Sequence, residues 1–274
     1  MTEPLATRFP RPSVVGIVNV TPDSFSDGGV HLQTEDAVAG ARRMVAEGAA
    51  VVDVGGESTR PGSEGVSLDE ELRRVGPVLE EIGGALAVSV DTSKAGVARL
   101  ALDLGAVMVN DVTALRGDPE LAAVVAGSDA YLCLMHMRGE PRTMQDEPRY
   151  DDVVSDVARF LEERLAFAVS AGIPEERVAL DPGIGFGKTV EHNLELLARL
   201  DEIVALGRPV LVGTSRKRFL GRVLGDPRAL TGPLTAAVAS SVVAFERGAS
   251  LFRVHDVREH VEALAAARAI EAAA

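Results

Sequence analysis

The chain has one cysteine, no tryptophan and few aromatic residues, and only three of its 28 basic residues are lysines. A single cysteine, Cys133, excludes an intramolecular disulfide and a multi-cysteine metal site. Gly, Asp or Arg interrupts each apolar stretch before it reaches the length that spans a bilayer, and the N-terminus lacks the basic and apolar segments of a secretory signal. We therefore expect a cytoplasmic protein with no membrane partner.

Positive charge is also scarce, with a formal net charge of -13. Proteins that bind the nucleic-acid backbone normally present a basic face, so we expect no nucleic-acid partner. A coding bias explains the preference for arginine over lysine. Under such a bias, a retained lysine indicates a position that needs a compact ammonium rather than a planar guanidinium. Lys94, Lys188 and Lys217 each follow the end of an expected strand.

What the chain does contain is a repeated unit, in which a short apolar run ends in a polar residue or glycine and a helical segment follows. The runs are Val14–Val18 before Asn19, Ala50–Val52 before Asp53, Leu86–Val90 before Asp91, Ala106–Val109 before Asn110, Tyr131–Met135 before His136, Val178–Leu180 before Asp181, Pro209–Val212 before Gly213 and Leu251–Phe252 before Arg253. Such units imply a parallel sheet, and about eight of them in roughly 250 residues predict an α/β fold, the (β/α)8 TIM barrel. We expect one domain over residues 1–274, with the polar stops converging on a cup at the C-terminal ends of the strands.

Two long loops are expected over that cup. The first, Asn19–Gly29, contains turn formers but is long for a βα connection and includes Phe25, which favours a lid over an ordinary turn. The second, Gly55–Ser63, has two glycines that let a ligand approach the backbone, followed by Thr59 and Arg60, which suit a phosphate. A flexible turn with solvated charge is the alternative for the second loop.

The middle of the chain offers polar groups with two possible roles. Alternation in the third strand places Ser89 and Asp91 on one face, while Thr92 or Ser93 could simply cap the next helix. Asp91 could be a cap too, and Asn110 carries the same ambiguity.

The segment Asp181–Thr189 ends in Gly-Lys-Thr but lacks the first glycine of a P-loop, and its Gly-x-Gly-x-Gly spacing is not the dinucleotide-binding fingerprint. A glycine-lined wall beside Asp181 remains, with Phe186 able to stack on a flat ligand.

The end of the chain carries two anion-binding patterns. Gly213–Phe219 starts a helix after the seventh strand, where backbone N–H groups, Ser215 and basic residues suit an anion. Arg253 and His255 share one face of the last strand and together suggest an anion clamp, because an arginine inside a barrel needs a counter-ion. The remaining histidines, His31, His192 and His260, are expected in loops or on helix surfaces.

From about Val14 to His260, these segments resemble the dihydropteroate synthase family of pterin-binding (β/α)8 enzymes. The resemblance rests on NVTPDSFSDGG, DVGGESTRPG, SVDTSK, VND, CLMHMRG, DPGIGFGK, GTSRK and RVHDV, in that order. It implies a transferase of folate biosynthesis, the target of sulfonamides. The reaction would join p-aminobenzoate to 6-hydroxymethyl-7,8-dihydropterin diphosphate, giving 7,8-dihydropteroate and pyrophosphate.

The resemblance also implies roles for individual residues. Asp91, Asn110, Asp181 and Lys217 would hold the pterin, in a flat pocket lined by Met135, Phe186 and Gly213. Asn19, Arg253 and His255 would hold the diphosphate, assisted by Thr59 and Arg60, and the chemistry would depend on Asp91, Asp181, Lys217, Arg253 and His255. Thr59, Pro61 and Phe25 would help form the aminobenzoate pocket, and the helix start near Ser215 would attract its carboxylate.

A magnesium cofactor and a homodimer are further implications of the resemblance. Mg2+ would bind Asn19 and phosphate oxygens, which agrees with a cation that keeps its waters and takes few protein ligands. One departure is Arg218, where many relatives have Ser, so the aminobenzoate contact would come from Arg218 or from backbone. A methyltetrahydrofolate-dependent corrinoid methyltransferase of the same barrel family is one alternative, but it would need neither the anion clamp nor the two long loops. A catalytically silent pterin-binding paralogue is the other, and the polar residues at every strand end argue against it.

Overall fold

The computed structural model of the chain describes residues 2–21, 29–59, 62–140 and 142–273. The strands are β1 (Ser13–Asn19), β2 (Val51–Gly55), β3 (Val88–Asp91), β4 (Met108–Asp111), β5 (Tyr131–Met135), β6 (Val178–Asp181), β7 (Leu211–Val212) and β8 (Leu251–Val254). The helices are α1 (Leu5–Arg8), α2 (Gly29–Ala46), α3 (Leu68–Ile82), α4 (Ala95–Asp103), α5 (Leu121–Ala126), α6 (Val153–Ser170), the 3-10 turn η2 (Glu175–Arg177), α7 (Val190–Ala198), α8 (Leu200–Val204), α9 (Arg218–Val223), α10 (Leu234–Glu246) and α11 (Val257–Glu271).

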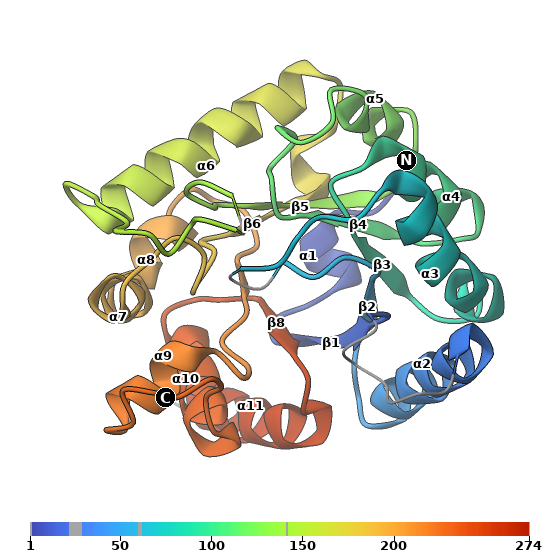
Figure 1. The fold of residues 1–274 in the computed structure, drawn as a ribbon. Helices are drawn as coiled ribbons and strands as arrows, with labels where there is room; N and C mark the ends of the chain where they lie inside the picture. Colours follow the sequence, from blue (N-terminus) through green and yellow to red (C-terminus); the bar gives the residue numbers. More distant parts are fainter. Residues whose placement is uncertain (1, 22–28, 60–61, 141, 274) are drawn as a thin grey trace.

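The strands form one parallel sheet that curls into a barrel, as predicted (Figure 1). Its order is β6-β5-β4-β3-β2-β1-β8-β7. The two ends of this sheet, β6 and β7, meet through a bridge between Leu180 and Val210, supported by the Leu180 N–H donating to the Pro209 carbonyl at 2.9 Å. The helices surround the sheet, and all the strands point toward the same open end.

Alternation along each strand sorts its side chains between two environments. In β2, Val52 and Val54 pack in the large core between strands and helices, while Val51 packs inside the barrel. In β8, Phe252 and Val254 likewise join the outer core. Residues at the alternate positions therefore face the barrel interior, which is apolar near the strand starts and polar near the strand ends.

The helices begin where local sequence signals place them. The Ser67 hydroxyl accepts from the Glu70 N–H at 3.2 Å at the start of α3, and the Asp152 carboxylate accepts from the Ser155 N–H at 2.7 Å at the start of α6. Thr189 and His192 form a capping box on α7. These caps fix where each preceding loop ends.

The helix α1 closes the N-terminal end of the barrel. Leu5 and the following Phe9 pack in one cluster with interior residues of seven strands, among them Met108, Tyr131 and Leu251. Phe9 meets the Tyr131 ring edge-on at 5.6 Å between centroids. In Figure 1, α1 lies within the ring of strands, behind its open end.

Three predictions about polar residues were wrong. Asp53 does not end its strand, because β2 continues to Gly55 and Asp53 lies inside the barrel. His136 does not join the cup, because its ring packs against Phe160 of α6, 4.8 Å between centroids. His260 is fully buried, not on a helix surface. None of the helices in the described ranges has the length and apolarity to cross a membrane.

Candidate functional site

The strand register brings the predicted site residues together at the open end of the barrel. Asn19 pairs with Gly55, Gly55 with Asp91, and Asp91 with Asn110, which places four neighbouring strand ends at one level. Further along the same barrel, Met135 of β5 pairs with Asp181 of the neighbouring strand β6. The predicted cup therefore exists, and carboxylates line it.

Arg253 lies between two of these carboxylates. Its Nε donates to Asp53 Oδ2 at 2.6 Å and its Nη2 donates to Asp91 Oδ2 at 2.7 Å. Asn110 Nδ2 donates to the same Asp53 oxygen at 2.9 Å. The counter-ions that an interior arginine requires are thus supplied by strands β2 and β3. Asp91 is occupied by this ion pair and is not a helix cap.

Two buried oxygens beside this ion pair have no hydrogen-bond partner within the described structure. They are Asp53 Oδ1 and Asn110 Oδ1, on residues that are 1% and 4% exposed. Buried acceptors without donors are unfavourable, so they favour a ligand that brings N–H groups.

Burial also raises the pKa values of two carboxyls in the cup. The pKa of Asp91 is raised to about 7, because burial and the nearby Asp53 charge outweigh the attraction of Arg253. The pKa of Asp181 is raised to about 6 by burial, against the Gly183 N–H and Lys217. A hydrogen-bond donor placed against either carboxyl would stabilise its ionised form and lower its pKa.

The loop after β6 is folded tightly around Asp181. The Gly183 N–H donates to Asp181 Oδ1 at 2.7 Å. Gly183 has φ of 66°, and a Cβ there would lie 1.8 Å from the His136 carbonyl oxygen, so only glycine fits. The Gly185 N–H donates to Asn193 Oδ1 at 2.6 Å. The glycines therefore serve this turn and the close approach of backbone to backbone.

Lys188 fixes the same loop from behind. Its side chain is buried, and Nζ lies 2.9 Å from the Gly183 carbonyl oxygen, 3.0 Å from the Phe186 carbonyl oxygen and 2.9 Å from His136 Nδ1. Burial lowers the pKa of Lys188 to about 7 and that of His136 to about 2. A neutral His136 accepts at Nδ1 while the ammonium donates. The resemblance of Gly187-Lys188-Thr189 to a P-loop thus has a structural explanation.

A flat apolar wall stands beside Asp181. Phe186 packs against a small cluster of Val112, Met135, Met137 and Met144. The ammonium of Lys217 lies over the Phe186 ring, 4.0 Å from its centroid. This combination of an aromatic ring, methionines and a cation suits one face of a planar heterocycle.

The last two strand ends are joined by hydrogen bonds. Ser215 Oγ lies 3.1 Å from His255 Nδ1 and accepts from the His255 N–H at 3.2 Å. Arg216 Nη2 donates to Asp256 Oδ1 at 2.9 Å. A Cβ on Gly213 would lie 3.7 Å from the Arg253 Cβ, so the loop after β7 passes close to β8. Ser215 therefore orients His255 beside Arg253.

Comparison with known proteins agrees with this geometry. Residues 15–255 match the family described as pterin binding enzyme. The dihydropteroate synthase of Escherichia coli strain K12 is 48% identical over 266 residues, covering 95% of this chain and 91% of the relative. The structure of Xanthomonas albilineans dihydropteroate synthase with 4-aminobenzoic acid has 47% identity and a TM-score of 0.89 over 99% of both chains. The complex of that enzyme with 7,8-dihydropteroate has 47% identity and a TM-score of 0.85, over 96% of this chain and 95% of that one.

The chain belongs to the dihydropteroate synthase family of pterin-binding enzymes.

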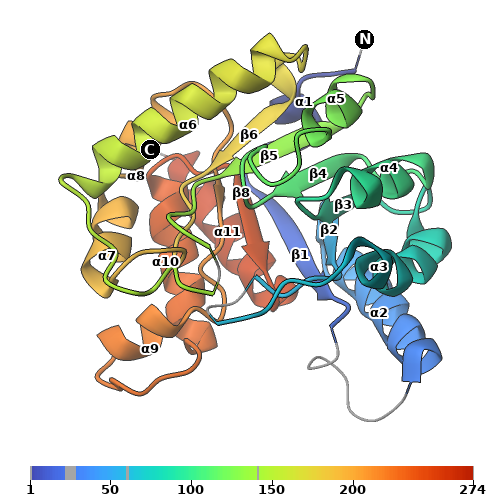
Figure 2. The ribbon, with the colours of Figure 1, turned by 45° about the horizontal axis from the view of Figure 1, so that its top comes forward.

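In this member of the dihydropteroate synthase family, most of the predicted site residues lie at or near the C-terminal ends of the strands. Arg60 lies outside the described residues, as do Phe25 and Pro61. Thr59 is half-buried in the described part of the β2–α3 loop. That loop runs across the open end of the barrel in Figures 1 and 2.

Two residues of this dihydropteroate synthase fold were not predicted as parts of the site. Asp53 is the nearest counter-ion of Arg253, and Lys188 holds the wall beside Asp181. Alternation along the strand could have identified Asp53, because Asp53 lies between two valines that face outward. For Lys188 the signal was present, because lysine is rare in this chain.

Proposed function

We propose that the protein is a dihydropteroate synthase. It would join p-aminobenzoate to 6-hydroxymethyl-7,8-dihydropterin diphosphate and release pyrophosphate. The observation that carries this proposal is the cup itself, where Asp53 and Asp91 share the Arg253 guanidinium and buried oxygens of Asp53 and Asn110 have no donor among the described residues. A pterin ring is flat and has several N–H donors, so it can supply the donors that these buried acceptors lack.

The pterin would lie between the Phe186 wall and the strand ends. Its adjacent ring N–H and amino donors match the carboxylate edge of Asp181, and Asn110 offers a further buried oxygen. Lys217, over the Phe186 ring, would donate to a ring acceptor. Met135 would complete the apolar lining, and Gly213 would leave room for the ring.

The diphosphate would lie toward β1 and β8. Arg253 uses Nε and Nη2 for its carboxylates, and within the described residues Nη1 makes no such bond, so it could donate to a phosphate oxygen. His255, oriented by Ser215, and Asn19 at the end of β1 would complete the clamp. These donors stabilise the charge that develops on the departing oxygen.

Magnesium is part of the proposal, and the donors at the end of β1 suit it. No group of three or more His, Cys, Asp or Glu side chains that could hold a metal occurs in the described part of the chain. A cation there would take Asn19 as a protein ligand and complete its shell with phosphate oxygens and water, as Mg2+ commonly does. When bound, it would supply charge neutralisation for the leaving diphosphate.

The reaction would be a substitution at the pterin methylene carbon. The bond from this carbon to the diphosphate oxygen breaks, a bond to the aminobenzoate nitrogen forms, and the nitrogen loses a proton. The carboxylates of Asp91 and Asp181 favour positive charge on the pterin as the diphosphate leaves. No nucleophile from the protein is required.

The aminobenzoate pocket would form nearer the mouth. Thr59 and Pro61 of the β2–α3 loop and Phe25 of the first loop would enclose the ring. Arg218, the first residue of α9, would offer a guanidinium to the carboxylate, near the backbone N–H groups at this helix start.

A homodimer in the cytoplasm is also proposed. Large apolar side chains are exposed on α9, on α10 and on the segment between them, including Leu224 at 64% and Leu230 at 79% exposure. Such side chains in one region support an interface formed by late helices. Light scattering behind a sizing column would decide it, and a monomer mass at micromolar concentration would refute the homodimer.

The deciding experiment for the activity measures pyrophosphate release from dihydropterin diphosphate, with and without p-aminobenzoate. We expect release that depends on p-aminobenzoate and is matched mole for mole by dihydropteroate. A protein that binds the pterin but releases nothing would be a silent paralogue. Methyl transfer from methyltetrahydrofolate to a corrinoid, without pyrophosphate release, would identify the other enzyme class.

A further inference from the structure

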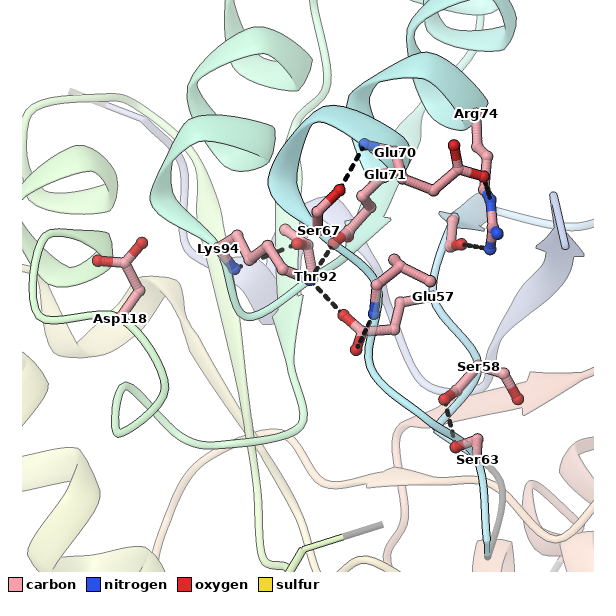
Figure 3. A network of polar contacts seen from close by, with 12 residues as sticks. Glu57, Ser58, Ser63, Ser67, Glu70, Glu71, Arg74, Thr92, Lys94 and Asp118 are labelled. Atoms are coloured by element: carbon pink, nitrogen blue, oxygen red, sulfur yellow. Dashed lines mark hydrogen bonds and ion pairs between the residues drawn. The ribbon is translucent and has the colours of Figure 1, made fainter. Parts of the chain in front are cut away.

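Lys94 joins two carboxylates that come from different elements (Figure 3). Its Nζ donates to Glu71 Oε2 at 2.5 Å and also to Glu57 Oε2. Glu57 belongs to the β2–α3 loop, and Glu71 lies in the first turn of α3. Lys94 itself is the residue that precedes α4. One ammonium therefore connects the loop to the starts of two helices.

Glu57 also connects the two ends of its own loop. Its second oxygen, Oε1, accepts from the Val66 N–H at 3.3 Å. A Cβ on Gly65 would lie only 3.0 Å from this oxygen, so the chain passes close to the carboxylate. Next to it, Arg74 Nη1 donates to the Gly56 carbonyl at 2.8 Å. The base of the loop is thus fastened on the side of α3.

The charges in this cluster make Lys94 indispensable to the arrangement. The Glu71 side chain is 0% exposed and its Oε1 has no partner within the described residues, whereas the Glu57 side chain is 21% exposed. Burial alone would lower the pKa of Lys94, but its hydrogen bonds to Glu57 and Glu71 outweigh burial. The pKa of Lys94 is therefore raised, and Lys94 stays charged. Without the ammonium, two adjacent carboxylates would repel each other. Glu57 would move, because Glu71 is held in a helix.

A lysine suits this position better than an arginine. A compact ammonium reaches both carboxylates from one nitrogen atom, while a planar guanidinium needs more room and presents its donors in one plane. Lysine occurs here although the chain uses arginine for most of its basic residues. Composition and geometry therefore agree on the need for an ammonium.

We propose that Lys94 is a positioning residue for the second substrate: through Glu57 it holds the β2–α3 loop where Thr59 reaches the aminobenzoate ring. This inference rests on the proposed function. Among the described residues, the Lys94 ammonium donates to Glu57 and Glu71 and not to the cup residues. The pterin groups are held separately, since Asp91 is fixed by Arg253 and Asp181 by the Gly183 N–H. Loss of Lys94 therefore weakens binding of p-aminobenzoate and leaves binding of the dihydropterin diphosphate unchanged.

The first experiment compares Lys94→Met and Lys94→Arg with the wild-type enzyme. We expect the KM for p-aminobenzoate to rise at least tenfold in both, with a smaller change in kcat. The Kd of dihydropterin diphosphate, measured by calorimetry, should stay within twofold. Arg73→Gln is the matched control, because it removes the exposed pair between Arg73 and Glu70 on the same helix and should leave every constant unchanged.

A second variant separates positioning from folding. In Lys94→Met combined with Glu71→Gln, the unpaired buried charge is gone, so the Tm should recover while the KM for p-aminobenzoate stays raised. Hydrogen exchange at the Val66 amide should be faster than in the wild type in both variants. A wild-type KM in the double variant, or unchanged Val66 exchange in Lys94→Met, would overturn the inference. Absence of pyrophosphate release in the wild type would instead refute the proposed function, and the exchange data would still test the anchoring.

Discussion

The Nζ atom of Lys217 lies 4.0 Å from the centre of the Phe186 ring, and its stem passes over Gly185. A Cβ on Gly185 would lie 3.1 Å from Lys217 Cδ, so the space around the stem is fully used. The ammonium is therefore held at one height above the ring, beside the carboxylate wall. That arrangement favours donation to a pterin acceptor from a single point.

The first prediction concerns this lysine. Lys217→Arg keeps the charge between Arg216 and Arg218 but replaces a point donor by a wider plane. We expect turnover to fall at least about tenfold, since the guanidinium does not fit between Gly185 and the ligand. Steady-state kinetics at saturating substrates measure this fall. Kinetics equal to those of the wild type would show that any cation suffices at position 217.

The second prediction concerns Asp181. Asp181→Asn keeps the size and can still accept from the Gly183 N–H, but it places an amide donor against the donor edge of the pterin. We expect pterin binding to weaken by about 2 kcal/mol or more, the usual cost of a mismatched buried polar group. Calorimetry on the folded variant tests this. Unchanged pterin affinity would remove Asp181 from the pocket.

The third prediction concerns stability and pH in the absence of ligand. Burial raises the pKa of Asp91 to about 7 and that of Asp181 to about 6, both from 3.8. Between pH 4 and 7 the folded state therefore binds more protons than the unfolded state. The contribution of these two groups to stability is fully present below pH 4 and is lost as the pH rises to 7.

Urea unfolding at pH 5 and pH 8 would measure this loss. Asp181→Asn cannot ionise, so it should lose less stability over that interval and exceed the wild type at pH 8 by on the order of 1 kcal/mol or more. The same substitution thus stabilises the ligand-free protein and weakens its binding of the pterin. Equal losses in the two proteins would mean that Asp181 titrates normally.

The fourth prediction concerns His255, which Ser215 orients beside Arg253. Removing the imidazole in His255→Ala should weaken binding of the pterin diphosphate while sparing the pterin without diphosphate, because the ring contacts lie on other strands. Aminobenzoate should then dock poorly, since the loops would close on the diphosphate-bound state. Equilibrium titrations with both pterins decide this. Equal losses of affinity for the two would make His255 a structural residue of the barrel.

Much of the fold could be predicted because each strand is a short apolar run with a polar stop. Tyr131–Met135 was predicted with the bounds that the structure gives. The failure at Asp53 has a physical cause. A charged residue after an apolar run normally marks the end of a buried strand. Here the strand continues past Asp53, whose charge is buried inside the barrel because Arg253, 200 residues away in the sequence, neutralises it.

The candidate site followed from the strand ends for the same reason. Asp91, Asn110 and Asp181 all lie where the predicted barrel places them. The sequence could not predict which strand-end residues turn outward. His136 faces α6 because Lys188, from the next loop, holds its ring nitrogen, and such a contact depends on the tertiary fold. The roles given to Arg60, Phe25 and Pro61 stay predictions, since these residues lie outside the described chain.

The position of α1 has a kinetic consequence. Leu5 and Phe9 fill the N-terminal end of the barrel, so molecules reach the cup from the opposite end. A pterin bound at the strand ends lies deeper than an aminobenzoate bound under the loops. The second substrate, once seated, would obstruct the path of the first. On the proposed placement of the two substrates, we therefore expect sequential binding with the pterin first, because the base of the barrel is closed, and the joined product would leave with its pterin end last.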